Sequence, residues 1–142
     1  PELRVGLYLL QRWRRGIHLY PSKIDRNFDI SCEVGDALSG TWGSIAWQEA
    51  DTGLPAGIPI KVRAPRPGEA VPLLKRPRRS IGQWLQEAGV PPYLRGCYPL
   101  VQAGDEIISI PDVGLTSACS NLNLCKGGLV PVWIPPKITF PN

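Results

Sequence analysis

The chain has 142 residues and a formal charge of +4, a length that suits one domain with a hydrophobic core or two small lobes. An apolar fraction of 43% and a charged fraction of 20% exclude an intrinsically disordered chain. Sixteen prolines and fifteen glycines favour short strands with many turns over long helices.

The sequence carries no sign of membrane insertion or export. No stretch approaches the roughly 18 consecutive apolar residues of a membrane span, and the first residues do not form a signal peptide. We therefore expect a cytoplasmic location and no membrane contact. The sequence begins at Pro1 rather than at Met, from which we expect a fragment of a longer protein.

The cysteines and the single histidine do not form a metal-binding pattern. Cys32, Cys97, Cys119 and Cys125 include no Cys-x-x-Cys pair, and His18 is the only histidine. A zinc site requires closer spacing, so we expect no metal ligands. A disulfide between the last two cysteines stays open, but four reduced, mostly buried thiols are the default, because nothing indicates an oxidising compartment.

The first 58 residues are predicted to be rich in β-structure. Residues 5–13 suit a helix or a strand, and the alternating segment at 17–20 that follows them favours a strand hairpin. Three later features are predicted: a short strand at 28–32, a tight turn at 38–43 that leads into a strand at 44–48, and a turn at 51–53.

Residues 59–80 are predicted to form a strand and then a cationic connection. The strand at 60–63 should carry its cations on one face and Ile60 and Val62 on the other. Pro72 and Pro77 lie in the connection that follows, so it cannot be helical throughout.

A short helix is predicted after Ser80, whose hydroxyl can accept a hydrogen bond from a free backbone N–H in the first turn. The apolar residues that follow are spaced as one helical stripe, made up of Ile81, Trp84, Leu85 and Ala88. Gly89 is typical of a helix end, and the double proline at 91–92 should prevent the helix from resuming.

The rest of the chain is predicted to form a hairpin, a loop and a last strand. Strands at 98–101 and 106–110 flank a Gln-Ala-Gly-Asp turn. Residues 116–128 are small and polar, which favours a mobile loop. Pro131 places the strand at 129–134 at a sheet edge, because proline lacks the N–H that an inner strand uses.

Positive charge gathers in two groups, which indicates either a nucleic-acid-binding face or ordinary solvated surface. One group comprises Arg12, Arg14 and Arg15, and the other has seven cations between Lys61 and Arg79. Four of those seven precede the predicted helix, whose N-terminus also attracts anions, so this region suits phosphate.

The sequence lacks the motifs of an enzyme active site. It has neither a GxxxxGK[ST] loop nor a GxGxxG loop after a strand, and the glycine-rich residues 39–44 are more typical of a hairpin turn. Asp105 and Glu106 would point to opposite sides of a strand, and Cys97 has no nearby histidine. We therefore assign no catalytic residue.

The central stretch resembles the C-terminal domain of bacterial tRNA(Ile)-lysidine synthetase. The matching residues extend over about 59–115, and the Gly-Val-Pro-Pro corner after a Gln-Glu helix is the most specific of them. They are Val62-Arg63, Gly68-Glu69, Arg79-Ser80-Ile81, Trp84-Leu85-Gln86-Glu87, Gly89-Val90-Pro91-Pro92-Tyr93-Leu94-Arg95, Pro99-Leu100 and Gly104-Asp105-Glu106. The chain has Gly82 and Gln83 where the family has two lysines, which leaves the preceding basic loop as the better candidate for phosphate binding.

The resemblance implies a compact α+β domain of short, mostly antiparallel strands in layered sheets with one or two short helices. This fold is similar to a domain of the phenylalanyl-tRNA synthetase beta chain. We expect three parts of that domain: an N-terminal β-rich part at 1–58, the synthetase-like core at 59–115, and a loop, edge strand and tail at 116–142.

The resemblance also implies a function for the parent protein. An ATP-dependent ligase, using ATP with magnesium, would modify a cytidine in the anticodon of tRNA(Ile) through an N-terminal catalytic domain that this chain lacks. The present domain would hold the tRNA and bind no cofactor itself. The expected partners are tRNA and the catalytic domain, and the sequence also allows a homodimer.

Seven cations are the candidate RNA-binding residues, because duplex RNA is recognised largely through its phosphates and its shape. They are Arg63, Arg66, Lys75, Arg76, Arg78, Arg79 and Arg95. Arg95 is equally suited to capping the corner and pairing with Glu87, and Trp84 is expected in the core rather than stacked on a base. The alternative function is a protein-interaction or structural domain that has solvated arginines.

Overall fold

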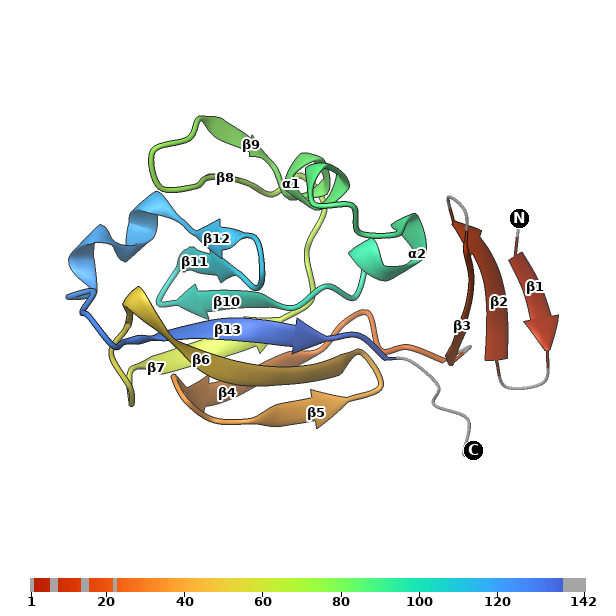
Figure 1. The fold of residues 1–142 in the computed structure, drawn as a ribbon, viewed down its shortest axis with the longest axis horizontal. Coiled ribbons are helices and arrows are strands. Elements are labelled where there is room, and N and C mark those ends of the chain that lie inside the picture. Colours follow the sequence, from red (N-terminus) through yellow and green to blue (C-terminus); the bar gives the residue numbers. More distant parts are fainter. Residues whose placement is uncertain (1, 6–7, 14–15, 22, 137–142) are drawn as a thin grey trace.

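The computed structural model describes residues 2–5, 8–13, 16–21 and 23–136. Within these ranges the chain forms four antiparallel sheets, two short α-helices and one 3-10 helix (Figure 1). The predicted α+β class, with mostly antiparallel strands in layered sheets, is confirmed.

The N-terminal strands form a sheet of their own. The sheet contains β1 (Glu2–Val5), β2 (Tyr8–Trp13) and β3 (Gly16–Pro21) in that order, and Figure 1 shows it at one end of the molecule. The hairpin reading of this segment is confirmed, except that the predicted first strand is divided between β1 and β2. Arg14 and Arg15 lie outside the described residues, as does the tail from residue 137.

A five-stranded sheet forms the centre of the molecule. Its order is β12-β11-β10-β7-β4, and it contains β4 (Asp29–Glu33), β7 (Pro59–Arg63), β10 (Leu100–Ala103), β11 (Glu106–Ile110) and β12 (Gly114–Leu115). The predicted hairpin of β10 and β11 is confirmed. β4 belongs to the first 58 residues and pairs with β7, so strand pairing crosses the expected boundary at residue 58.

A three-stranded sheet of order β13-β6-β5 is layered on the central sheet (Figure 1). It contains β5 (Leu38–Gly40), β6 (Gly43–Leu54) and β13 (Leu129–Ile134). The edge position of β13 is confirmed. The predicted turn at 51–53 is wrong, because β6 continues through it: Gly53 exchanges backbone hydrogen bonds of 3.0 Å with Cys125 in both directions.

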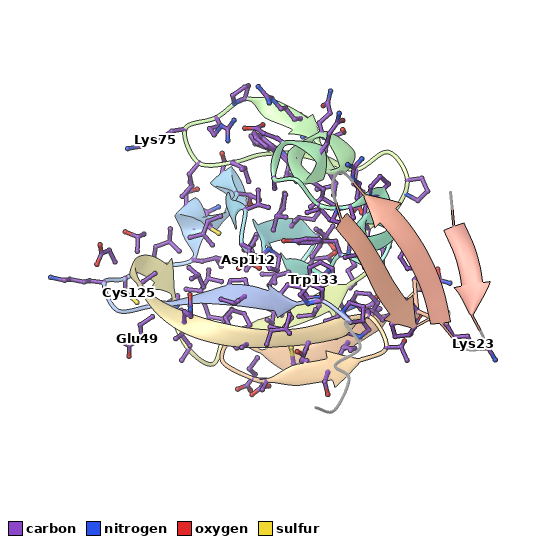
Figure 2. All side chains as sticks on the ribbon, turned by 45° about the vertical axis from the view of Figure 1, so that its right-hand side comes forward. Lys23, Glu49, Lys75, Asp112, Cys125 and Trp133 are labelled. Carbon is purple, nitrogen blue, oxygen red and sulfur yellow. The ribbon has the colours of Figure 1, made fainter. Side chains whose placement is uncertain are left out.

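One apolar core lies between the two sheets and the helices. Ile45 and Trp133 contribute from the three-stranded sheet, and Ile60 and Val62 from the central one. The Asp112 carboxylate accepts a 3.0 Å hydrogen bond from the Trp133 backbone N–H, which joins the two layers at a point visible in Figure 2.

The expectation of a mobile loop at 116–128 is wrong. Ser117–Asn121 form the 3-10 helix η1, and the hydroxyl of buried Thr116 caps its first turn. Cys119 is fully buried against β11, where its thiol donates to the Ile108 carbonyl over 2.9 Å. The polar composition of this segment did not indicate its attachment to the core, because the residues that are buried there, Thr116 and Cys119, are small.

All four cysteines are free thiols, so the disulfide that the sequence left open is absent. Cys97 and Cys119 are buried, and burial raises the pKa of each thiol to about 11. Cys32 is half-buried and Cys125 is exposed, so the default of mostly buried thiols holds fully for two of the four.

Candidate nucleic-acid interface

A β-hairpin presents most of the candidate cations at the surface. It consists of β8 (Ala70–Pro72) and β9 (Arg78–Ser80), which pair antiparallel. Leu73 anchors the connecting loop, because its side chain is buried and its backbone bridges to Thr116. In Figure 2, Lys75 points outward from the tip of the hairpin into solvent.

The helix that follows is built as the sequence predicted. α1 (Ile81–Glu87) begins directly after β9, and the Ser80 hydroxyl accepts a 3.1 Å hydrogen bond from the Gln83 backbone N–H. The Gln83 side chain accepts in return from the Ser80 N–H, which completes a capping box. Gly89, at a φ of 79°, follows the helix end.

The double proline lies after the end of α1 and at the start of a second helix. α1 does not resume beyond the double proline, as expected, but a separate one-turn helix that the sequence did not predict, α2 (Pro92–Arg95), starts at Pro92. Proline is tolerated at the first helical position, since the N–H it lacks would have no partner in the helix there.

Four exposed cations lie on this hairpin, and we call them the hairpin cations: Lys75, Arg76, Arg78 and Arg79. Arg78 lines a cavity of about 380 Å³, together with Ser117 and Asn121 of η1. The hairpin therefore carries its charge at the solvent boundary, beside a recess in the surface.

Arg76 and Arg79 share one carboxylate. Arg76 Nη2 lies 2.6 Å from Glu87 Oε1, and Arg79 Nη1 lies 2.8 Å from Glu87 Oε2. Both guanidinium groups also cover the Trp84 ring, at 4.7 and 5.2 Å from its centroid. Trp84 itself is 1% exposed and donates through Nε1 to the Val71 carbonyl, so its predicted place in the core is confirmed.

Arg63 does not belong to this surface, which corrects its place among the RNA-binding candidates. Arg63 is only 3% exposed. Its guanidinium lies 2.5 Å from the Glu69 carboxylate and donates to the Gln102 side chain over 2.6 Å. The cation face predicted for this strand was right for exposed Lys61 but wrong for Arg63, because the turn that carries Glu69 folds over it.

Arg66 and Arg95 lie on other parts of the surface. Arg66 has a side chain 60% exposed and pairs with Asp29 over 3.5 Å. Arg95 donates through Nε to the Val90 carbonyl over 2.9 Å, in agreement with the capping interpretation. Glu87, the partner suggested for Arg95, is held by Arg76 and Arg79.

A further exposed cation, Arg26, was not predicted as a site residue, because no local pattern singled it out. Its guanidinium stacks 4.9 Å above the Tyr93 ring and donates to the Tyr93 carbonyl over 2.9 Å. A Cβ atom at Gly96 would come within 2.7 Å of Arg26 Nη1, so glycine at 96 permits this packing. Arg26 and Arg66 line one small cavity of about 120 Å³.

Metal-ligating side chains do not cluster among the described residues. Across these ranges, three or more His, Cys, Asp or Glu side chains nowhere gather in a way that could hold a metal ion. The glycine-rich residues 39–44 form the β5–β6 hairpin, as the sequence predicted, rather than a loop that leads into a helix. No described helix is long and apolar enough to cross a membrane.

The fold and site define a small antiparallel α+β domain with a basic hairpin in front of a capped helix. The family model described as "TilS substrate C-terminal domain" matches residues 60–131. That match takes in half of the chain, including β7, the hairpin and both helices, and the chain belongs to this family. The resemblance proposed from the central residues is confirmed.

Curated relatives agree with the family assignment. The tRNA(Ile)-lysidine synthase of Chromobacterium violaceum is 34% identical over 145 residues, which cover 96% of this chain and 32% of that protein. The enzyme of the same name from Pseudomonas aeruginosa is 39% identical over 84 residues, or 58% of this chain and 17% of that protein. That of Serratia proteamaculans is 28% identical over 83% of this chain and 28% of that protein. The chain spans about a third or less of the length of these relatives.

Proposed function

We propose that this chain is the tRNA-recognition domain of an ATP-dependent tRNA(Ile)-lysidine synthetase. It would hold the tRNA while an N-terminal catalytic domain of the same protein modifies the anticodon cytidine. The observation that carries the proposal is the hairpin of β8 and β9, which presents four exposed cations directly before the capped N-terminus of α1.

The physical argument rests on phosphate binding. A-form RNA is recognised mainly through its backbone and shape, and arginine and lysine side chains supply the required charge. Because Arg63 is buried, it is left out of the proposed contact residues. These are the hairpin cations together with Arg66 and Arg95. Arg26 extends the set, because it lines the same cavity as Arg66.

The proposed function also implies where the cofactors of the parent enzyme act and where the protein is located. ATP and magnesium would act in the catalytic domain of the same protein. A role with tRNA would place the protein in the cytoplasm. A homodimer stays a separate prediction, and analytical ultracentrifugation of the chain at several concentrations checks it.

The test is binding of a tRNA(Ile) transcript at 50 and 200 mM salt, with oligo(U) of equal length as the unstructured control. Four phosphate contacts predict a loss of affinity on the order of 100-fold between these salt concentrations. The variant Arg78→Glu/Arg79→Glu should lose most of the binding. The matched control is Lys23→Glu/Lys126→Glu, which changes the charge equally at two other exposed positions and should bind like a protein of slightly lower charge.

Two results would count against the proposal. Unchanged affinity in the arginine variant would remove the hairpin from the RNA-binding surface. Absence of tRNA binding by the unaltered chain at 50 mM salt would contradict the proposal that this domain recognises tRNA and would favour the protein-interaction alternative.

A further inference from the structure

Glu87 holds an unusual position for an acidic residue. It is the last residue of α1, at the end where the helix macrodipole disfavours negative charge. Its carboxylate is compensated by two arginines that reach it from the hairpin, one bonded to each oxygen. The hydrogen bond from Arg76 and the charges of Arg76 and Arg79 lower the pKa of Glu87, so it is ionised at neutral pH.

The two arginines are held in a fixed arrangement. Each guanidinium has the Glu87 carboxylate on one side and the Trp84 ring below it, and Trp84 is fixed in the core by its bond to Val71. Two long side chains that would otherwise move freely are thus kept at a set spacing.

The Glu87 carboxylate does not use all the N–H donors of the two arginines. A guanidinium has five N–H donors, and Glu87 accepts from one nitrogen of each. Donors on both arginines therefore remain for a second anion. At the same time the negative charge of Glu87 cancels one of the four positive charges on the hairpin.

We propose that Glu87 is a specificity-determining residue of the hairpin surface. It fixes Arg76 and Arg79 at a spacing that suits the regular phosphates of folded RNA, and it lowers the charge that would attract any polyanion. This inference rests on the proposed function, since it concerns how the same surface distinguishes folded tRNA from unstructured RNA.

The physical reason lies in how the two kinds of RNA respond. Folded tRNA has phosphates at set distances, so it gains from arginines that are already ordered. An unstructured strand can adapt its backbone to any arrangement of cations, so its binding depends mainly on total charge.

The experiment measures affinities of the Glu87→Gln variant for a tRNA(Ile) transcript and for oligo(U) of equal length over a series of salt concentrations. We expect affinity for oligo(U) to rise on the order of fivefold, with a steeper dependence on salt, and affinity for tRNA to change less. Selectivity for folded tRNA should therefore fall.

Two further variants separate charge from position. Glu49→Gln makes the same change of charge at an exposed residue of β6, far from the hairpin tip in Figure 2, and should leave selectivity unchanged. Glu87→Asp keeps the charge on a side chain too short to bridge both arginines. It should weaken binding to tRNA and leave oligo(U) unaffected.

The outcomes distinguish this inference from the function it rests on. If the unaltered chain binds tRNA and Glu87→Gln behaves like Glu49→Gln with both RNAs, the role of Glu87 is wrong and the proposed function stands. If the unaltered chain does not bind tRNA at low salt, both are wrong. Circular dichroism of each variant confirms that the fold is retained.

Discussion

Arg63 was expected to bind RNA, but its buried guanidinium instead forms an ion pair with Glu69 that stabilises the fold. Two nitrogens of Arg63 reach the two oxygens of Glu69, at 2.5 and 3.0 Å, and the Arg66 backbone N–H donates to the same carboxylate over 2.6 Å. The pair fastens the turn after β7 to the central sheet. Removing one partner would leave the other charged group buried without compensation, which is costly.

At this scale we predict that Glu69→Gln lowers the free energy of unfolding by about 2 kcal/mol at pH 7, because Gln keeps an acceptor but not the charge. Urea unfolding measures the change. Glu49→Gln, at an exposed position, is the control and should alter stability by less than about 0.5 kcal/mol.

The same pair predicts a dependence on pH. Burial acts to raise the pKa of Glu69, but the hydrogen bonds from Arg63 and Arg66 and their charges outweigh it, so the pKa is lowered from its usual 4.5. A lowered pKa stabilises the folded state above pH 4.5, and that contribution is lost as the pH falls through the folded-state value. The stability difference between the unaltered chain and Glu69→Gln should therefore shrink below pH 4.5. A difference that does not vary with pH would contradict the role of this carboxylate.

At the scale of elements, β9 and α1 act as one unit. Ser80 ends the strand and caps the helix, so a single residue sets the angle at which the hairpin meets α1. Ala70 pairs with Ser80 across the hairpin, which ties the cap to β8 as well. The arrangement places β9 directly before the first turn of α1, and the Arg79 side chain reaches from β9 to Glu87 at the last residue of the helix.

We predict that Ser80→Ala destabilises the chain by about 1 kcal/mol, because the first turn loses its hydroxyl acceptor. Thermal unfolding measures the loss. Ser80→Thr keeps the hydroxyl and suits a strand, so it should retain most of the stability. Equal losses in the two variants would show that the cap hydrogen bond is not the cause.

On the scale of the whole molecule, the segment that defines the family is not a self-contained fold. Residues 60–131 contain all but the first residue of β7 without its neighbour β4, and the first half of β13 without its neighbour β6. Ile45 and Leu54 of β6 are buried in the core and would be missing from it. Strands that lose their neighbours expose both backbone groups and apolar side chains.

We therefore predict that a fragment of residues 60–131 does not unfold cooperatively, whereas residues 23–136 do. Urea unfolding followed by circular dichroism compares the two fragments. A cooperative transition of the shorter fragment, at a stability similar to that of the longer one, would contradict the need for β4 and β6.

The sequence by itself determined the features whose signals act over a few residues. The Ser80 cap, the stripe around Trp84 and the hairpin of β10 and β11 depend on neighbours within one or two turns of the chain. The family resemblance came from the same central stretch. Charge was also readable locally, since the four hairpin cations lie together in the sequence and remain exposed.

Only the tertiary structure decided which charged groups meet and which are buried. Arg26 and Tyr93 lie 67 positions apart in the sequence, and no local pattern relates them. Arg63 is buried because the turn that carries Glu69 folds over it, and Glu87 forms ion pairs with Arg76 and Arg79 rather than with Arg95. The length of β6 likewise depended on its distant partner Cys125. In each instance the energy comes from contacts between residues far apart along the chain, which the local sequence does not encode.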